Sequence, residues 1–232
     1  MRVRTRRKGV EQTRGSCTLR RAEAPAHRGA AVAGFAQNSM SKTTLGSYWR
    51  FLLAGLFNQG QTGAVVPSQR FLIDRMIEPI PPDYRGQIIE LGAGTGALTQ
   101  RLAARCPYAT VIACEINAVL AKVTQHSLTA AGLNGRVQLI SGAAEQVLSR
   151  IRRGEMNQPQ FIVSGIPLGN LSRQAVLDLV HKVHRAIAPG GLYIQFQHSL
   201  LDRGKIKATF SRLRTIPVFL NFPPAVIYYA QK

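Results

Sequence analysis

Two kinds of hydrophobic pattern alternate along residues 67–232. Short apolar runs with the length of buried strands occur at Gln87 to Leu91, Thr110 to Cys114, Val137 to Ile140, Phe161 to Ser164 and Leu192 to Gln197. Helical patterns separate them, at about 97–105, 117–131, 143–152 and 171–188. This alternation predicts an α/β fold with a mostly parallel sheet and helices on both faces. In such a sheet, ligands bind beyond the carboxyl ends of the strands.

A helical stripe of apolar residues precedes this region. Its members are spaced i, i+3, i+4, i+7, i+8, i+11 and i+12, namely Leu45, Tyr48, Trp49, Leu52, Leu53, Leu56 and Phe57. Lys42 and Arg50 flank the stripe. Such a helix either packs on a domain core or lies in a membrane interface, with its aromatic rings at the headgroup boundary. The periodicity leaves both uses open.

Residues 1–39 follow neither pattern. They are rich in Arg, Ala and Gly, and they carry nine Lys or Arg against Glu11 and Glu23. A segment with so few apolar residues cannot bury enough surface to become ordered. We therefore predict a disordered basic leader at 1–39, an amphipathic helix with a linker at 40–66, and one folded domain at 67–232. The leader either is a nucleic-acid or targeting arm or has no role.

Charge and cysteine content bear on the environment of the protein. The chain has 30 Lys or Arg against 11 Asp or Glu, a formal net charge of +19. This excess attracts anionic polymers and anionic membranes alike, so it does not separate RNA from lipid. Three cysteines without a Cys-x-x-Cys pair predict neither a disulfide framework nor a metal site, and they fit a reducing compartment. No apolar run reaches the roughly 18 residues needed to cross a bilayer, so we expect a cytoplasmic protein.

A glycine-rich loop, Gly92-Ala93-Gly94-Thr95-Gly96, follows the first apolar run. Glycines allow a sharp turn and a close approach of the backbone to a ligand, and the loop also fits a loose dinucleotide fingerprint. Two carboxylates sharpen this signal, although only the first separates the ligands, because NAD would accept the second equally. Glu90 precedes the loop, where it can accept from an ammonium group, whereas a pyrophosphate has no use for an anion there. Glu115 follows the second strand and is placed to accept hydrogen bonds from both ribose hydroxyls.

These segments resemble a known family. The run from Glu90 to Thr99 resembles the first motif of class I methyltransferases, and the run from Ala113 to Asn117 resembles their second. The resemblance implies a Rossmann-like, seven-stranded sheet and S-adenosylmethionine as cofactor. It places Glu115 on the ribose, Ile116 on the adenine face, and the following residues around the methionine part: Glu90, Gly92, Ala93, Gly94 and Gly96.

The family often places an acid after its third strand, in contact with the adenine amine. This chain has Ala143 and Ala144 at the corresponding positions. The resemblance then implies that both alanines border the cofactor and that a backbone amide takes the place of the acid. This departure also keeps open a third class of function, a catalytically idle cofactor-binding or lipid-binding module.

The segment after the fourth strand bears on the substrate. Enzymes of this fold that methylate base amines usually carry Asn/Asp-Pro-Pro-Tyr or Asn-Leu-Pro-Tyr there, which supplies a proton acceptor and an aromatic plane for a flipped base. This chain reads Ser164-Gly165-Ile166-Pro167-Leu168-Gly169-Asn170, which argues against a flipped base. Ser164, Asn170 and His198 lie at strand ends, and we predict that they steer an amine or relay its proton, although a lone histidine there is often a bystander.

Three segments resemble the bacterial phospholipid N-methyltransferases: Gly63 to Ser68, Val163 to Leu168 and Asn221 to Val226. The likeness covers about residues 45–232. It implies methylation of the amine of phosphatidylethanolamine toward phosphatidylcholine, with the first helix as a membrane anchor. We therefore expect a peripheral enzyme on the inner face of the cytoplasmic membrane, with an anionic membrane surface and a phospholipid as partners. Ribosomal RNA adenine dimethyltransferases share the loop and the overall plan, so this activity is the alternative.

A basic run follows Asp202 with no acid among its cations, which are Arg203, Lys205, Lys207, Arg212 and Arg214. Near an anionic leaflet each such cation contributes about 1 kcal/mol of attraction. The same run is able to bind an RNA backbone or to be a solvated basic loop.

Overall fold

The computed structural model describes residues 67–219 and 224–232. The predicted leader at 1–39 and the amphipathic helix at 40–66 lie outside these residues. Half of the segment from Asn221 to Val226 that resembles lipid methyltransferases, residues 221–223, does so as well. Those assignments therefore stay predictions.

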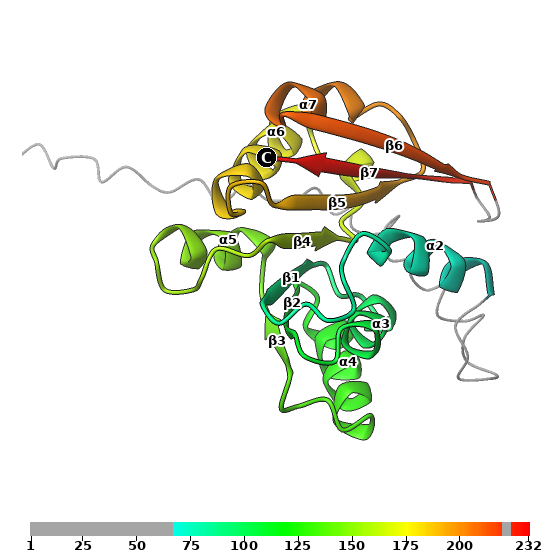
Figure 1. Ribbon diagram of the computed structural model, residues 1–232, viewed down its shortest axis with the longest axis vertical. Helices are drawn as coiled ribbons and strands as arrows, with labels where there is room; N and C mark the ends of the chain where they lie inside the picture. Colours follow the sequence, from blue (N-terminus) through cyan, green and yellow to red (C-terminus); the bar gives the residue numbers. More distant parts are fainter. Residues whose placement is uncertain (1–66, 220–223) are drawn as a thin grey trace, which may run out of the picture. The chain divides into compact units, whose positions relative to one another are not determined.

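A seven-stranded sheet runs through the described region in the order β3-β2-β1-β4-β5-β7-β6 (Figure 1). Its strands are β1 (Gln87–Leu91), β2 (Thr110–Glu115), β3 (Val137–Ser141), β4 (Phe161–Ser164), β5 (Leu192–Gln197), β6 (Arg212–Val218) and β7 (Ala225–Gln231). The first five strands pair in parallel, and β7 pairs antiparallel with both β5 and β6. The predicted α/β fold with a mostly parallel, seven-stranded sheet is confirmed.

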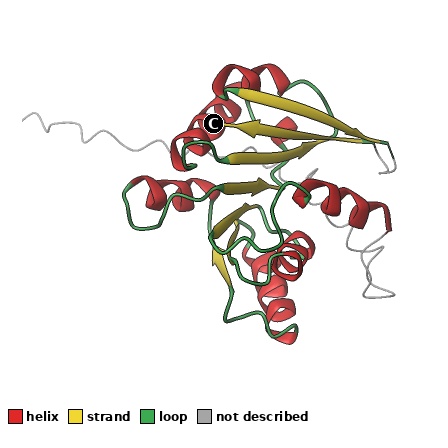
Figure 2. Cartoon of the chain, in the orientation of Figure 1, coloured by secondary structure: helices red, strands yellow, loops and turns green. Residues whose placement is uncertain are grey.

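Helices connect the strands (Figure 2). They are α2 (Pro67–Ile77), α3 (Ala97–Arg105), α4 (Ala118–Ala130), α5 (Ala144–Arg152), the short 3-10 helix η1 (Leu168–Asn170), α6 (Arg173–Ala186) and α7 (Arg203–Thr209). Asn117 begins α4 because its side chain accepts from the N–H groups of Val119 and Leu120, at 2.9 and 3.0 Å. None of the helices in the described ranges is long and apolar enough to cross a membrane.

The apolar core lies on both faces of the sheet. Successive side chains of β1 point to opposite faces, so Ile89 packs in the cluster with α5 and α6, while Ile88 packs in the cluster with α2 and α3. Burial on both faces explains why the parallel strands read as continuous apolar runs.

The carboxyl ends of the five parallel strands meet at one edge of the sheet, which we term the carboxyl edge. The last strands also reach it, because Gln197 at the end of β5 pairs with Val226 in β7, and Val218 at the end of β6 pairs with Ala225. The end of β6 and the start of β7 therefore lie at the same edge as the ends of β1, β2 and β4.

Candidate cofactor and substrate site

Backbone hydrogen bonds fix the glycine loop between β1 and α3. The N–H groups of Gly92 and Ala93 both donate to the carbonyl of Cys114, each at 2.9 Å. Gly94 donates to Glu115 Oε2 at 2.9 Å, and its carbonyl accepts from the Thr124 hydroxyl at 2.7 Å. The loop is therefore held against β2 and α4 by the chain's own hydrogen bonds, which preorganise it.

The glycine loop passes very close to the loop that follows β4. Gly92 has a φ of 80°, in the left-handed region that favours glycine. A Cβ atom built on Gly165 would lie 2.9 Å from the carbonyl oxygen of Gly92, closer than two such atoms approach. Both positions therefore need glycine, one for its conformation and the other for the close backbone crossing.

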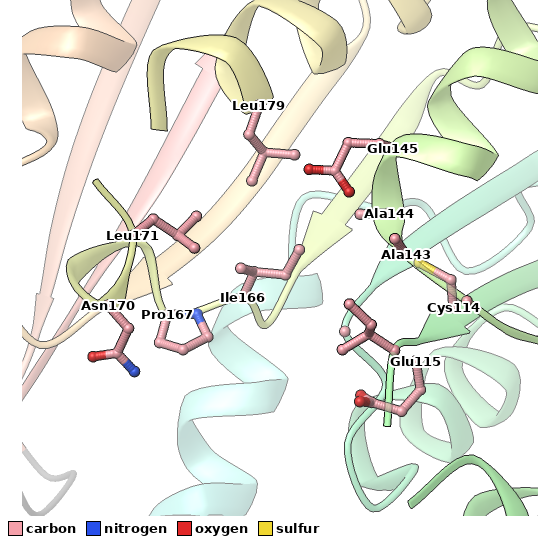
Figure 3. Close-up of a pocket in the computed structure, with 13 residues that line it drawn as sticks. Cys114, Glu115, Ala143, Ala144, Glu145, Ile166, Pro167, Asn170, Leu171 and Leu179 are labelled. Carbon is pink, nitrogen blue, oxygen red and sulfur yellow. The ribbon is translucent and has the colours of Figure 1, made fainter. Parts of the chain in front are cut away.

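A cavity of about 190 Å³ opens beside this crossing (Figure 3). It lies at the ends of β2, β3 and β4, which agrees with a ligand site at the carboxyl edge. Its wall is mostly apolar, and the residues that form it are Gly92, Cys114, Glu115, Ile116, Gly142, Ala143, Ala144, Glu145, Ile166, Pro167, Asn170, Leu171 and Leu179. No aromatic side chain is among these described wall residues.

Glu115 contributes a buried carboxylate whose charge is compensated by the backbone. Its Oε1 accepts from the N–H of Asn117 at 2.8 Å, and its Oε2 accepts from the N–H of Gly94. Each carboxylate oxygen can accept a second hydrogen bond. The neighbouring Ile116 is exposed on the cavity wall. A carboxylate with free lone pairs beside an open apolar surface suits a ribose and its base.

Glu90 has a very different environment. Its side chain is fully buried, and neither carboxylate oxygen has a hydrogen-bond partner among the described residues. Burial raises the pKa of this carboxyl from 4.5 to about 7; the nearby Thr99 hydroxyl opposes the rise, and the negative charge of Glu115 adds to it. A buried carboxylate without a partner is unfavourable, so this position favours a cation.

The structure separates Glu90 from the cavity. Glu90 alternates with Ile89 along β1 and therefore shares the sheet face of Ile88, the face that α3 covers. The cavity lies on the other face, where its wall includes Leu179 from α6. Glu90 can reach a ligand only where the ligand extends over the end of β1.

Glu145 is a wall residue that the sequence analysis missed. It follows Ala143 and Ala144 in the first turn of α5, and Figure 3 shows its carboxylate among the wall residues, near Leu179. In this view the two alanines lie between Glu145 and Glu115. An acid is therefore present at the cavity two positions after the first alanine. The direction of the Glu145 side chain depends on the residue at which α5 begins, because each residue turns the helix by about 100°.

The loop after β4 is clamped by polar side chains from β4 and β5. The Ser164 hydroxyl accepts from the N–H of Ile166 at 3.3 Å, and the carbonyl of Ile166 accepts from Gln195 and Gln197 at 2.9 and 3.2 Å. Ser164 and both glutamines are buried. These contacts hold Ile166 and Pro167 on the cavity wall. Glutamines within an apolar strand are the sequence signal that could have revealed this clamp.

The predicted substrate residues are not all brought together. Asn170, at the end of η1, is exposed and lines the cavity. Ser164 is not on the wall, and its hydroxyl contacts the loop instead. His198 is not on the wall either; its Nδ1 lies 3.0 Å from the carbonyl oxygen of Pro224, and its ring meets that of Phe196 edge-on at 5.8 Å. Their roles toward an amine remain predictions.

The predicted cofactor residues also divide into two groups. Those on the cavity wall are Gly92, Glu115, Ile116, Ala143 and Ala144. Those that form the strand end and the loop behind it are Glu90, Ala93, Gly94 and Gly96. These residues fit S-adenosylmethionine chemically, because Gly92 presents bare backbone to the cavity, Glu115 can accept from hydroxyls, and the unpartnered Glu90 suits a positive charge.

Comparison with known proteins agrees with this geometry. A family described as "Methyltransferase domain" matches residues 88–191. Ornithine lipid N-methyltransferase from Singulisphaera acidiphila is 24% identical over 78% of this chain and 95% of its own length. Ribosomal RNA small subunit methyltransferase C from Vibrio parahaemolyticus is 29% identical over 78% of this chain. The match covers 48% of that relative's own length.

The fold is also shared with solved structures. An O-methyltransferase from Bacillus cereus, solved in complex with SAH, superposes with a TM-score of 0.58 at 19% identity, over 82% of this chain and 91% of its own. The predicted resemblance to class I methyltransferases and the predicted cofactor are confirmed. The domain match, the seven-stranded sheet and the preorganised glycine loop together identify the chain as a class I methyltransferase that uses S-adenosylmethionine.

Proposed function

We propose that this methyltransferase transfers a methyl group to the amine of phosphatidylethanolamine at the inner face of the cytoplasmic membrane. The observation that carries the proposal is the cavity wall after β4. Gly165 and Leu168 stand where base methyltransferases carry the amide or acid and the aromatic ring, and Ile166 and Pro167 between them form the wall, so this stretch offers no platform for a flipped base. The relative named as an ornithine lipid N-methyltransferase supports a lipid amine as the acceptor.

The residues of the chain divide the binding of the cofactor among them. S-adenosylmethionine, when bound, supplies an electrophilic methyl group on a positively charged sulfur. Glu115 accepts from the ribose hydroxyls, Ile116 and Ile166 present apolar surfaces to the adenine, and Glu145 accepts from the adenine amine. Glu90, at the end of β1, compensates the positive charge of the methionine part.

Methylation of an amine places modest demands on the protein. An amine that has lost its proton is already a nucleophile, so no strong base is needed. The protein must align the reacting groups and exclude water, an effect worth up to roughly 7–11 kcal/mol. The clamped loop after β4 provides one rigid wall for this alignment, and Asn170 provides a polar group at the cavity that accepts from the amine.

A lipid methylation assay tests the proposal. The protein is incubated with labelled S-adenosylmethionine and with vesicles of phosphatidylglycerol that contain phosphatidylethanolamine. We expect label in mono- or dimethylated phosphatidylethanolamine, and no label with vesicles of phosphatidylglycerol alone. Parallel samples contain ornithine lipid or ribosomal RNA. Label confined to ornithine lipid would contradict phosphatidylethanolamine as the substrate. Methylated adenosine in the RNA, with no label in the lipid, would support the alternative activity in place of the proposal.

A Glu115→Ala variant controls for the cofactor site. This variant is expected to lose lipid labelling, because Glu115 lines the cavity and holds Gly94. Labelling that persists in the variant preparation would indicate a contaminating enzyme and would remove the support for the proposal.

A further inference from the structure

Exposed apolar side chains are unevenly placed on the molecule. Eight large ones are exposed in the described ranges, and five of them lie at the carboxyl edge: Ile116, Val119, Leu200, Leu201 and Phe219. Ile116 lines the cavity just after β2, and Val119 lies in the first turn of α4. The other three lie beyond β5 and β6. The edge that carries the cofactor site is therefore also the edge with most of the exposed apolar surface.

Leu200, Leu201 and Phe219 form what we term the apolar corner. Their exposed fractions are 57%, 84% and 79%. Leu200 and Leu201 follow β5, and Phe219 follows β6; Figure 1 shows the ends of these two strands pointing to the same side. The two loops adjoin, because Nδ1 of His198 lies 3.0 Å from the carbonyl oxygen of Pro224, and β6 pairs with β7 up to Val218 and Ala225.

Exposed positive charge adjoins the apolar corner on one side, in α7 (Arg203–Thr209). The backbone N–H of Arg203 donates to the carbonyl of Leu200 at 3.1 Å, and its exposed guanidinium donates to the Thr215 hydroxyl in β6 at 3.3 Å, so this charge lies between the loop after β5 and strand β6. Lys207 is exposed one helical turn further along α7. The one acid between residues 199 and 219 is Asp202, which is buried and paired with Lys205. No exposed acid in this segment offsets the exposed cations.

Exposed apolar side chains on loops, with two exposed cations in the adjoining helix and no exposed acid between residues 199 and 219, suit one kind of partner. In the interface of an anionic bilayer, leucine and phenylalanine side chains enter the acyl boundary while arginine and lysine meet the headgroup phosphates. If a protein partner covered the corner instead, it would bury these cations, and the partner would have to supply acidic side chains to pair with them.

We infer that the apolar corner inserts Leu200, Leu201 and Phe219 into the interface of an anionic bilayer and thereby holds the cavity at the level of the lipid headgroups. The purpose of this contact rests on the proposed lipid substrate, but the contact itself is measured without any reaction. The apolar corner is a different part of the chain from the predicted membrane helix at 40–66.

Vesicle binding of the full chain tests the inference. A Leu201→Ser/Phe219→Ser variant is compared with wild type by co-sedimentation with phosphatidylglycerol vesicles. We expect at least a tenfold lower partition coefficient. The matched control is Tyr108→Ser, because Tyr108 is 57% exposed but lies in the turn before β2, at the opposite edge of the sheet. Equal binding of both variants and wild type would overturn the inference.

A fluorescence measurement tests directly whether the apolar corner inserts into the bilayer. The sequence contains one tryptophan, Trp49, so Leu201→Trp in a Trp49→Phe background places a single probe at the corner. With vesicles, we expect a blue-shifted emission that lipids brominated on their acyl chains quench. Emission that stays solvent-like while the protein co-sediments would exclude insertion. Unchanged circular dichroism and cofactor binding establish that each variant is folded.

Two further readouts separate this inference from the proposed function. If both hold, the double variant loses labelling of vesicle lipid but keeps labelling of the same lipid dispersed in detergent. Vesicle binding through the corner without methylation of any lipid would reject the proposed function and retain the inference. Self-association that the double variant abolishes, measured by sedimentation velocity without lipid, would show that a second copy covers the corner and would overturn the inference.

Discussion

The ends of β1 and β2 carry two buried carboxylates on neighbouring strands, yet the protein treats them in opposite ways. Glu115 accepts two backbone hydrogen bonds, and its charge is part of the folded loop. Glu90 accepts none from the described residues, and its pKa is raised to about 7. The difference indicates that one carboxylate is built to be an acceptor before any ligand arrives, while the other is stabilised as an anion only by an incoming positive charge.

The largest effect is expected from Glu115→Ala. The substitution leaves the partly buried N–H groups of Gly94 and Asn117 without an acceptor, and each such loss costs about 1–3 kcal/mol. We therefore expect the free energy of unfolding to fall by about 4 kcal/mol in urea denaturation. Glu115→Gln, which keeps an acceptor oxygen, should lose clearly less. Equal stability of the alanine variant and wild type would contradict a structural role for this carboxylate.

The next effect concerns the stability contributed by Glu90 as the pH changes. The folded state holds this proton more tightly than the unfolded chain, because its pKa is about 7 in place of 4.5. Stability therefore falls as the pH rises from about 4.5 to about 7, by about 3 kcal/mol at 1.36 kcal/mol per pKa unit. Relative to wild type, Glu90→Gln should gain stability over this range. Parallel pH profiles of the two proteins, measured by urea denaturation, would refute the buried, unpartnered state of Glu90.

Cofactor affinity should depend on pH in the opposite direction. Only ionised Glu90 compensates a positive charge, so S-adenosylmethionine should bind about tenfold more weakly at pH 6 than at pH 8. Isothermal titration calorimetry at several pH values measures this, and Glu90→Gln should flatten the dependence. A wild-type affinity that does not change between these pH values would mean that Glu90 does not face the cationic part of the cofactor.

The smallest effect is expected at Glu145, which is exposed on the cavity wall. Loss of one hydrogen bond, worth about 1 kcal/mol, should weaken cofactor binding about fivefold in Glu145→Ala. The wild type should prefer S-adenosylhomocysteine over its inosine analogue, which lacks the adenine amine, and the variant should not. A preference that survives the substitution would assign the amine contact to another group, such as a backbone amide.

The sequence predicted the parallel part of the sheet well and its antiparallel end poorly. The first five strands and the four helices between them were placed within two residues, because strands buried on both faces read as apolar runs. The hairpin of β6 and β7 was not located. Strand β6 carries Arg212, Arg214 and Pro217 at the edge of the sheet, so its residues alternate between polar and apolar and include a proline that an edge strand tolerates.

The parts of the candidate site that depend on backbone conformation were predictable from the sequence. The parts that depend on the direction of a side chain were less so. The glycine loop and Glu115 could be identified from their spacing alone. The contribution of Glu145 depends on the first residue of α5, and the clamp of Gln195 and Gln197 depends on which carbonyl the two amides reach. The glutamines within an apolar strand signal buried polar side chains, but not the carbonyl that they reach, because that contact joins segments far apart in the sequence.

The crossing of Gly165 over the carbonyl of Gly92 limits how substrate choice can change. Aligned on its proline, Gly165-Ile166-Pro167-Leu168 matches Asn-Leu-Pro-Tyr of base methyltransferases, so Gly165 stands at the asparagine. An asparagine here would bring its Cβ to 2.9 Å from the Gly92 oxygen. The loop that bears on the choice of acceptor and the loop that binds the cofactor are thus in steric contact, so one cannot change without the other. Converting this enzyme to a base methyltransferase would require redesigning the β1 turn together with the loop after β4, so single-residue exchange is a poor route to a new acceptor.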